Sequence, residues 1–181
     1  MMMSGVILLE QNEKLSTVFG ELTDGKPIEF KNEIDQRQMQ VVRHWAEAFR
    51  MLRGVSHLWR LFQRMCTGVI LGLPEKTEDA QWRPDHQLFL ATREAGYSPR
   101  HMFKGLIHEL GHAFEDDLGV EYTERNSLYG NPPFADNYAA TNPTEDFAET
   151  FMLYHMQADM LYHTCCVKWL DMDEKVRKFL Q

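Results

Sequence analysis

The segment from Ser98 to Gly119 constrains the fold more than any other part of the sequence. Ser98-Pro99 is a strong helix start, because serine is a preferred N-cap and proline fits the first helical position. Gly119 is the expected terminator of the helix, directly after Leu118. We therefore expect a helix over 99–118 whose flanks and back are buried through the apolar residues Leu106, Ile107, Leu110, Ala113 and Phe114.

Short apolar runs elsewhere predict β-strands. Three of them lie near the N-terminus, at Val6–Leu9, Leu15–Phe19 and Ile28–Phe30, and Asp24-Gly25 between the last two is a turn signal. A further strand is expected at His86–Ala91, directly before the 99–118 helix. From its place in the sequence, this strand could pair with an extended substrate by strand addition.

Helical spacing of apolar residues predicts four more helices, at about 33–53, 56–66, 143–161 and 172–180. Gly54 occupies the expected C-terminal cap of the first, and Ser56 the expected N-cap of the second. Asn142-Pro143 repeats the cap-then-proline start. We expect an α+β fold with a small N-terminal mixed sheet and helices, an active-site helix, and a helical C-terminal subdomain.

The length of 181 residues suits one domain, with an α/β lobe over about 1–118 and a helical lobe over about 119–181. The net charge of −8 argues against a nucleic-acid partner. Three cysteines, two of them adjacent, are not a disulfide framework and fit a reducing compartment. No apolar run is long enough for a signal peptide or a membrane span, so a cytoplasmic location without a membrane partner is expected. Non-classical secretion as an effector is an open alternative, and the oligomeric state is unknown.

The centre of the predicted long helix reads His108-Glu109-Leu110-Gly111-His112. Positions i and i+4 share one helix face, so both imidazoles can reach one metal ion. Glu109 lies one step round the helix, where a general base for a zinc-activated water is needed. Gly105 and Gly111 each cost about 1 kcal/mol relative to alanine inside a helix, and such a cost is tolerated where another segment packs closely.

A peptidase-type zinc site needs three protein ligands and one open position for water. Glu145 and Glu149 are four residues apart on a predicted helix and therefore share a face. One of them can bind the metal while the other accepts the N–H of a ligating histidine, and spacing alone leaves the assignment open. Glu145 could instead be the acidic half of a capping box with Asn142, and Asp146 is a further candidate ligand.

The HELGH sequence followed by Glu145 and Glu149 resembles the gluzincin metallopeptidases, and among them the anthrax lethal factor catalytic domain and Pro-Pro endopeptidase group. That group carries a tyrosine seven residues before the ligand glutamate, which is Tyr138 here, in YAATNPTEDFAETF. The match covers residues 105–151. It implies a zincin-like fold, and the roles it implies are one Zn²⁺ ion on His108, His112 and Glu145, Glu149 beside His108, Glu109 as general base, and Tyr138 at the oxyanion.

The expected function is a zinc-dependent endopeptidase that acts on a protein or peptide substrate. The alternative is a catalytically silent, zinc-stabilised binding or regulatory domain. The presence of Glu109 favours the enzyme, because a structural zinc site needs no base and normally has four protein ligands. Tyr129 or Tyr122, from the same loop as Tyr138, could also supply the oxyanion donor.

Overall fold

The computed structural model describes residues 14–74, 79–93, 97–119, 123 and 126–181, so the predicted strand at Val6–Leu9 lies outside the described residues. The described chain combines helices with a small mixed sheet and is α+β, as the sequence predicts. It divides into two compact units, Met1–Leu106 and Ile107–Gln181, with the boundary inside helix α4 (Pro99–Leu118). That 1–181 form a single metallopeptidase domain stays a prediction.

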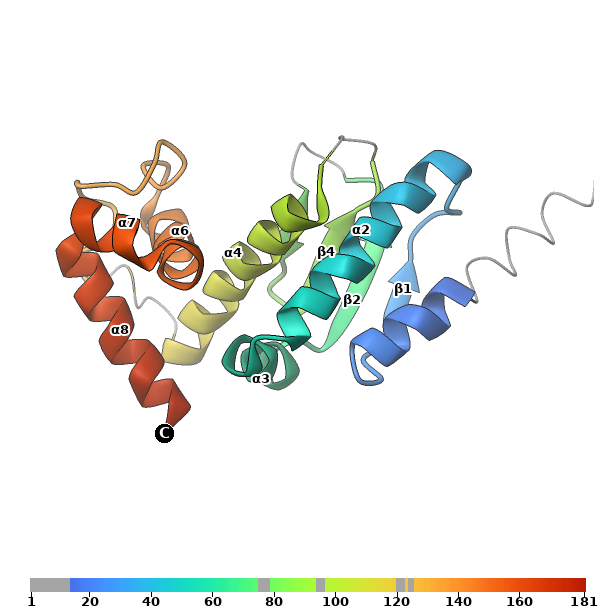
Figure 1. Ribbon diagram of the computed structural model, residues 1–181, viewed down its shortest axis with the longest axis horizontal. Helices are drawn as coiled ribbons and strands as arrows, with labels where there is room; N and C mark the ends of the chain where they lie inside the picture. Colours follow the sequence, from blue (N-terminus) through green and yellow to red (C-terminus); the bar gives the residue numbers. More distant parts are fainter. Residues whose placement is uncertain (1–13, 75–78, 94–96, 120–122, 124–125) are drawn as a thin grey trace, which may run out of the picture. The chain divides into compact units, whose positions relative to one another are not determined.

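The first unit contains a four-stranded sheet with the strand order β1-β2-β4-β3 (Figure 1). Its strands are β1 (Ile28–Phe30), β2 (Gly68–Gly72), β3 (Ala80–Trp82) and β4 (Gln87–Ala91). β1 and β4 run parallel to β2, whereas β3 runs antiparallel to β4. The predicted strands at 28–30 and 86–91 are confirmed, the second from Gln87 onward. β2 has no counterpart among the predicted strands, although its apolar, fully buried run is typical of a strand covered on both faces.

β4 is an interior strand, because β2 and β3 occupy its two sides. Both rows of its backbone hydrogen-bonding groups are therefore engaged within the sheet. The expectation that an extended substrate pairs with this strand is wrong. Within the described residues, the strands at the edges of the sheet are β1 and β3.

Helices α2 (Gln36–Arg53) and α3 (Ser56–Met65) follow β1, and Figure 1 shows α2 lying across the sheet. The Trp45 indole N–H donates to the Ala91 carbonyl at 2.9 Å, which ties α2 to the end of β4. The start of α2 is later than predicted because Asp35 caps it, through a capping box with Gln38. In α3, Ser56 is the first helical residue rather than the cap.

The predicted strand at Leu15–Phe19 is wrong, because residues 14–22 form a helix. Phe19 and Leu22 are buried, and Phe19 packs edge-on against Phe49 of α2 with ring centroids 6.0 Å apart. Leu15, Phe19 and Leu22 have the i, i+4, i+7 spacing of one helix face. The predicted Asp24-Gly25 turn follows this helix, and both residues have positive φ.

The second unit contains the C-terminal part of α4 and the helices α6 (Pro143–Met156), α7 (Ala158–Thr164) and α8 (Cys166–Leu180). Phe114 of α4 is at the centre of its core. Its ring lies 6.2 Å from Phe147, 5.2 Å from Phe151 and 5.7 Å from Phe179, all measured between ring centroids. These contacts pack α4 against α6 and α8.

The chain from 143 to 180 was expected to form two helices, but it forms three, with corners at Gln157 and Cys165. Neither corner contains glycine or proline. At each corner the backbone N–H still bonds the carbonyl four residues earlier, as Gln157 does to Leu153 and Cys165 to Leu161. The chain can therefore change direction without leaving the N–H of either corner residue unpaired. Because this does not require glycine or proline, the sequence contains no signal that predicts the corners.

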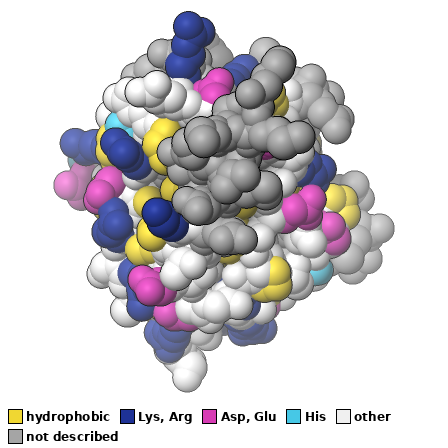
Figure 2. Space-filling model, turned by 90° about the vertical axis from the view of Figure 1, so that its right-hand side faces the viewer, with side chains coloured by type: hydrophobic (Ala, Val, Ile, Leu, Met, Phe, Trp, Pro, Cys, Tyr) yellow, Lys and Arg dark blue, Asp and Glu magenta, His cyan; other side chains and the backbone are white. Residues whose placement is uncertain are grey.

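None of the helices in the described part of the chain is long and apolar enough to cross a bilayer. Figure 2 shows one face of the molecule, on which basic and acidic side chains of the described residues are interspersed. Charges of both signs side by side suit a hydrated surface.

Candidate metal centre

Helix α4 forms as the local sequence predicts. The Ser98 hydroxyl accepts the His101 N–H at 3.3 Å, Pro99 is the first helical residue, and Gly119 ends the helix with a φ of 106°. The unit boundary falls after Leu106, so the whole HELGH sequence belongs to the second unit. All of the side chains considered for the metal centre therefore lie within one unit.

The two histidines of α4 converge on one carboxylate oxygen. Glu145 Oε2 lies 3.1 Å from His108 Nε2 and 3.5 Å from His112 Nε2. The imidazole rings of His108 and His112 are nearly perpendicular, with centroids 5.0 Å apart. One ligand atom from each of the three residues lies within 4.8 Å of the others, which makes the trio a group that could hold a metal ion.

Glu145 reaches this position from the first turn of α6. The Asn142 side chain caps this helix by accepting the Glu145 N–H at 3.0 Å, and Pro143 occupies the first position. The Glu145 carboxylate lies against the two histidines instead of folding back onto Asn142. The capping-box alternative for this carboxylate is therefore not the arrangement found.

Glu149 lies on the other side of the His108 ring, with Oε1 2.9 Å from Nδ1. A carboxylate in this position can accept a hydrogen bond from the Nδ1–H, which keeps the proton on Nδ1 and leaves Nε2 unprotonated to face a metal. The geometry therefore distinguishes the two glutamates, which spacing could not. Asp146, the remaining candidate, is fully buried and pairs with Lys168 of α8 at 2.7 Å.

The charges of the trio are strongly coupled. Burial lowers the pKa of His108, but the Glu145 and Glu149 carboxylates outweigh it and raise that pKa to about 10. Burial likewise opposes ionisation of Glu145, yet His108 and His112 hold its pKa well below the usual range. The site is therefore built around a positive charge between carboxylates, and a divalent cation could replace the proton on His108.

Glu109 is buried beside this trio, and its negative charge acts on the pKa values of both His108 and Tyr138. Tyr138 is half exposed, and its ring centroid lies 5.6 Å from that of His108. Burial of the hydroxyl, followed by the charges of Glu145 and Glu109, raises the pKa of Tyr138 to about 12. The phenol thus stays protonated at neutral pH and can donate a hydrogen bond.

The other tyrosines of this loop are placed differently. The Tyr129 ring is buried against Phe147, and its hydroxyl donates to Asp171 of α8 at 2.9 Å. Tyr129 is therefore committed to the core of the second unit. Tyr122 lies outside the described residues.

Gly111 permits a close approach of α4 and α6. A Cβ atom at this position would lie 2.8 Å from the Ala148 Cα and 3.1 Å from the Ala148 carbonyl oxygen, so only glycine fits without a shift. A Cβ at Gly105 would meet no described atom within 4 Å. The close-packing explanation for these two glycines is thus confirmed at Gly111 and wrong at Gly105.

Lys168, a buried lysine that pairs with Asp146, the neighbour of the candidate ligand Glu145, was not identified from the sequence. It precedes the predicted start of the last helix, which actually begins at Cys166. The available signal was its spacing: Lys168 shares a helix face with Met172 and Val176, and all three are buried.

Comparison of the chain with known protein families gives no match, and comparison with curated proteins gives none either. The resemblance to the gluzincin metallopeptidases therefore stays a prediction that rests on the residues of the site.

Proposed function

We propose that this protein is a zinc-dependent endopeptidase of the gluzincin type, with a zincin-like fold. The observation that supports this most directly is the placement of a single oxygen of Glu145 against Nε2 of both His108 and His112. The second imidazole nitrogen of His108, Nδ1, lies 2.9 Å from Glu149 Oε1. Two imidazoles and one carboxylate are one of the ligand sets that hold a catalytic zinc, and a second carboxylate beside a ligating histidine is a common support for it.

Two of the three distances between the ligand atoms fit zinc. Nitrogen and oxygen ligands about 2.0–2.1 Å from a tetrahedral zinc lie about 3.3 Å from one another. The two nitrogen–oxygen distances, 3.1 and 3.5 Å, fall on either side of this value. A zinc ion bound here would act as a Lewis acid and lower the pKa of a coordinated water to about 7.

Glu109 is the general base in this proposal. It follows His108 directly on α4 and is buried, and the effect of its negative charge on the pKa values of His108 and Tyr138 supports a position near the ligands. It accepts a proton from the attacking water and passes it to the leaving amine, so that both proton transfers of peptide hydrolysis use one group.

Tyr138 is the oxyanion donor. Its hydroxyl keeps its proton at neutral pH, as a phenol ordinarily does, and the rise of its pKa to about 12 extends this into the alkaline range; the residue is half exposed. A hydrogen bond from this hydroxyl to the developing oxyanion would strengthen in the transition state. One such donor is typically worth about 3 kcal/mol, which is on the order of a 100-fold change in rate.

The proposal is tested by removing metal from the purified protein with a chelator, restoring zinc, and following cleavage of a mixed peptide library by mass spectrometry. We expect one zinc per chain and zinc-dependent cleavage. The matched control is Glu109→Gln, which should retain zinc and lose at least about 100-fold in kcat. Cleavage by this variant at the wild-type rate, or a wild-type protein that takes up no zinc, would refute the proposal. Zinc uptake without cleavage of any peptide would favour the binding-domain alternative.

A further inference from the structure

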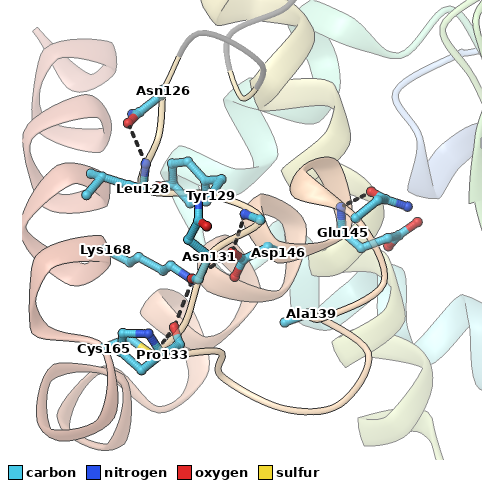
Figure 3. Close-up of polar contacts among 12 residues, drawn as sticks. Asn126, Leu128, Tyr129, Asn131, Pro133, Ala139, Glu145, Asp146, Cys165 and Lys168 are labelled. Atoms are coloured by element: carbon cyan, nitrogen blue, oxygen red, sulfur yellow. Dashed lines mark hydrogen bonds and ion pairs between the residues drawn. The ribbon is translucent and has the colours of Figure 1, made fainter.

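Lys168 is buried in the second unit, and its ammonium group forms all of its hydrogen bonds with other segments of that unit. Its side chain is only 3% exposed, and its Nζ donates to Asp146 Oδ2 at 2.7 Å, to the Asn131 carbonyl at 2.9 Å and to the Pro133 carbonyl at 2.8 Å (Figure 3). An ammonium has three N–H donors, so all of them are used. Lys168 therefore joins α8 to α6 and to the loop that precedes α6.

Asp146 connects this cation to the metal centre. It is fully buried, follows Glu145 directly in the first turn of α6, and its Oδ2 also accepts the Gly130 N–H at 2.9 Å. One carboxylate oxygen thus holds both Lys168 and the backbone of the loop. The Cys165 thiol adds a contact of 3.3 Å to the Pro133 carbonyl from the same side.

The loop that Lys168 holds at one end carries Tyr138 further along. Asp136 Oδ1 accepts the N–H groups of Tyr138 and Ala139, each at 2.9 Å, and the Thr141 N–H returns to the Tyr138 carbonyl at 3.0 Å. Asn142 then caps α6. Tyr138 therefore sits between two fixed points, the Lys168 contacts at Asn131 and Pro133 and the helix cap.

Stability alone is a poor explanation for a buried ion pair at this place. Desolvating two charges costs several kcal/mol per ion, and replacing such pairs by apolar residues is often neutral or stabilising. Asp146 Oδ1 is buried and has no hydrogen-bond partner in the described part of the chain, which adds to the cost. What the ammonium supplies, and an apolar side chain could not, is three directed donors that fix two loop carbonyls and one carboxylate.

We propose that Lys168, acting through Asp146 and the loop carbonyls, is a positioning residue that holds Tyr138 beside the Glu145 carboxylate. Among the described residues, its three hydrogen bonds go to Asp146 and to the two loop carbonyls, and none goes to a candidate metal ligand. The proposal rests on the proposed peptidase function for its consequence on rate, because Tyr138 matters only if it stabilises the oxyanion.

The test is a double-mutant cycle on kcat. The variant Lys168→Met/Asp146→Asn removes both charges while the new amide oxygen can still accept the Gly130 N–H, and Lys178→Met, an exposed lysine on the same helix, is the matched control. With wild-type Tyr138, we expect the double variant to lower kcat about 10- to 100-fold, with KM and zinc content little changed. In a Tyr138→Phe background the same changes should lower kcat less than about three-fold. An equal loss in both backgrounds would overturn the proposal.

Hydrogen exchange of the backbone gives a readout that does not need activity. We expect faster exchange over 130–139 in the double variant and unchanged exchange there in Lys178→Met, whether or not the wild type cleaves peptides. Unaltered exchange over 130–139 would refute the positioning role even if the proposed function holds. Should the double variant fail to fold, Lys168→Arg replaces it. The planar guanidinium keeps the positive charge but cannot direct its donors to the same three acceptors as the ammonium. The kcat comparison in the two Tyr138 backgrounds and the exchange over 130–139 then test the proposal in this variant.

Discussion

The contact between Gly111 and Ala148 leads to the sharpest prediction about this protein. Replacing Gly111 by alanine would place a methyl group 2.8 Å from the Ala148 Cα, a backbone atom of α6 that cannot rotate away. An ordinary carbon–carbon contact needs about 3.5–4.0 Å, so α6 must move by about 1 Å. Because Ala148 lies between Glu145 and Glu149 in the sequence, this shift would move both carboxylates relative to the histidines.

The loss of stability caused by this steric clash can be separated from the change in helix propensity with a control variant in the same helix. Gly105→Ala meets no described atom within 4 Å and should gain about 1 kcal/mol of stability from helix propensity alone. Gly111→Ala has the same gain, but overpacking of a close contact typically costs about 1–3 kcal/mol. The difference between the two variants should therefore be about 1–3 kcal/mol, which corresponds to about 2–12 °C in Tm for a chain of this size.

The assay is thermal unfolding of both variants without metal, followed by a zinc titration against a chromophoric chelator. Gly111→Ala should also bind zinc about 10- to 100-fold more weakly, because displaced carboxylates no longer hold His108 in place. Gly105→Ala should bind zinc like the wild type. Equal Tm values for the two variants, or wild-type zinc affinity in Gly111→Ala, would refute the reasoning.

Three further predictions concern the ligands and the cysteines. Glu149→Ala should weaken zinc binding about 10- to 100-fold by releasing His108 Nδ1, and wild-type affinity in a chelator competition would contradict this. Although burial opposes it, the two carboxylates raise the pKa of His108 to about 10 in the metal-free protein. Zinc must therefore displace a proton below that pH, so zinc affinity should rise about ten-fold per pH unit between about pH 7 and 9, and calorimetry in two buffers that detects no proton release would exclude this. Exposed Cys166 should react with a thiol reagent well before buried Cys165 and before Cys66, whose pKa is raised to about 11 by burial; equal labelling of the three in peptide mapping would disprove it.

Elements fixed by local chemistry were predicted closely from the sequence. Helix α4 begins at Pro99 and ends before Gly119 as expected, because Ser98, Pro99 and Gly119 act on their immediate neighbours. The short apolar run at Leu15–Phe19 was predicted wrongly as a strand, since runs of this length fit either structure. The i, i+4, i+7 spacing of Leu15, Phe19 and Leu22 was the local signal for a helix, and it becomes visible only when the run is extended beyond Phe19 to Leu22.

In the candidate site, too, the features that depend on local sequence could be predicted, and those that depend on packing between helices could not. The convergence of His108 and His112 follows from spacing on one helix and could be predicted. The choice between Glu145 and Glu149 could not be made from spacing, because it depends on how α6 is rotated against α4; at the sequence level only the family resemblance favoured Glu145 as the ligand. Lys168 was missed because the last helix starts earlier than predicted, at a corner that no glycine or proline marks.

The rotation of α6 has a simple cause in the Gly111–Ala148 contact. The histidines of α4 lie three residues before and one residue after Gly111, and the glutamates of α6 lie three before and one after Ala148. At about 100° per residue, these positions lie about 60° and 100° round each helix from the point of contact, on the same side. On each helix the two residues therefore lie on one side of the contact, one helical turn apart, and the distances of 2.9–3.5 Å between the histidines and the glutamates show that these two sides meet. The ligand set and its supporting carboxylate thus depend on a single backbone approach, and enlarging either small residue should separate all four side chains at once.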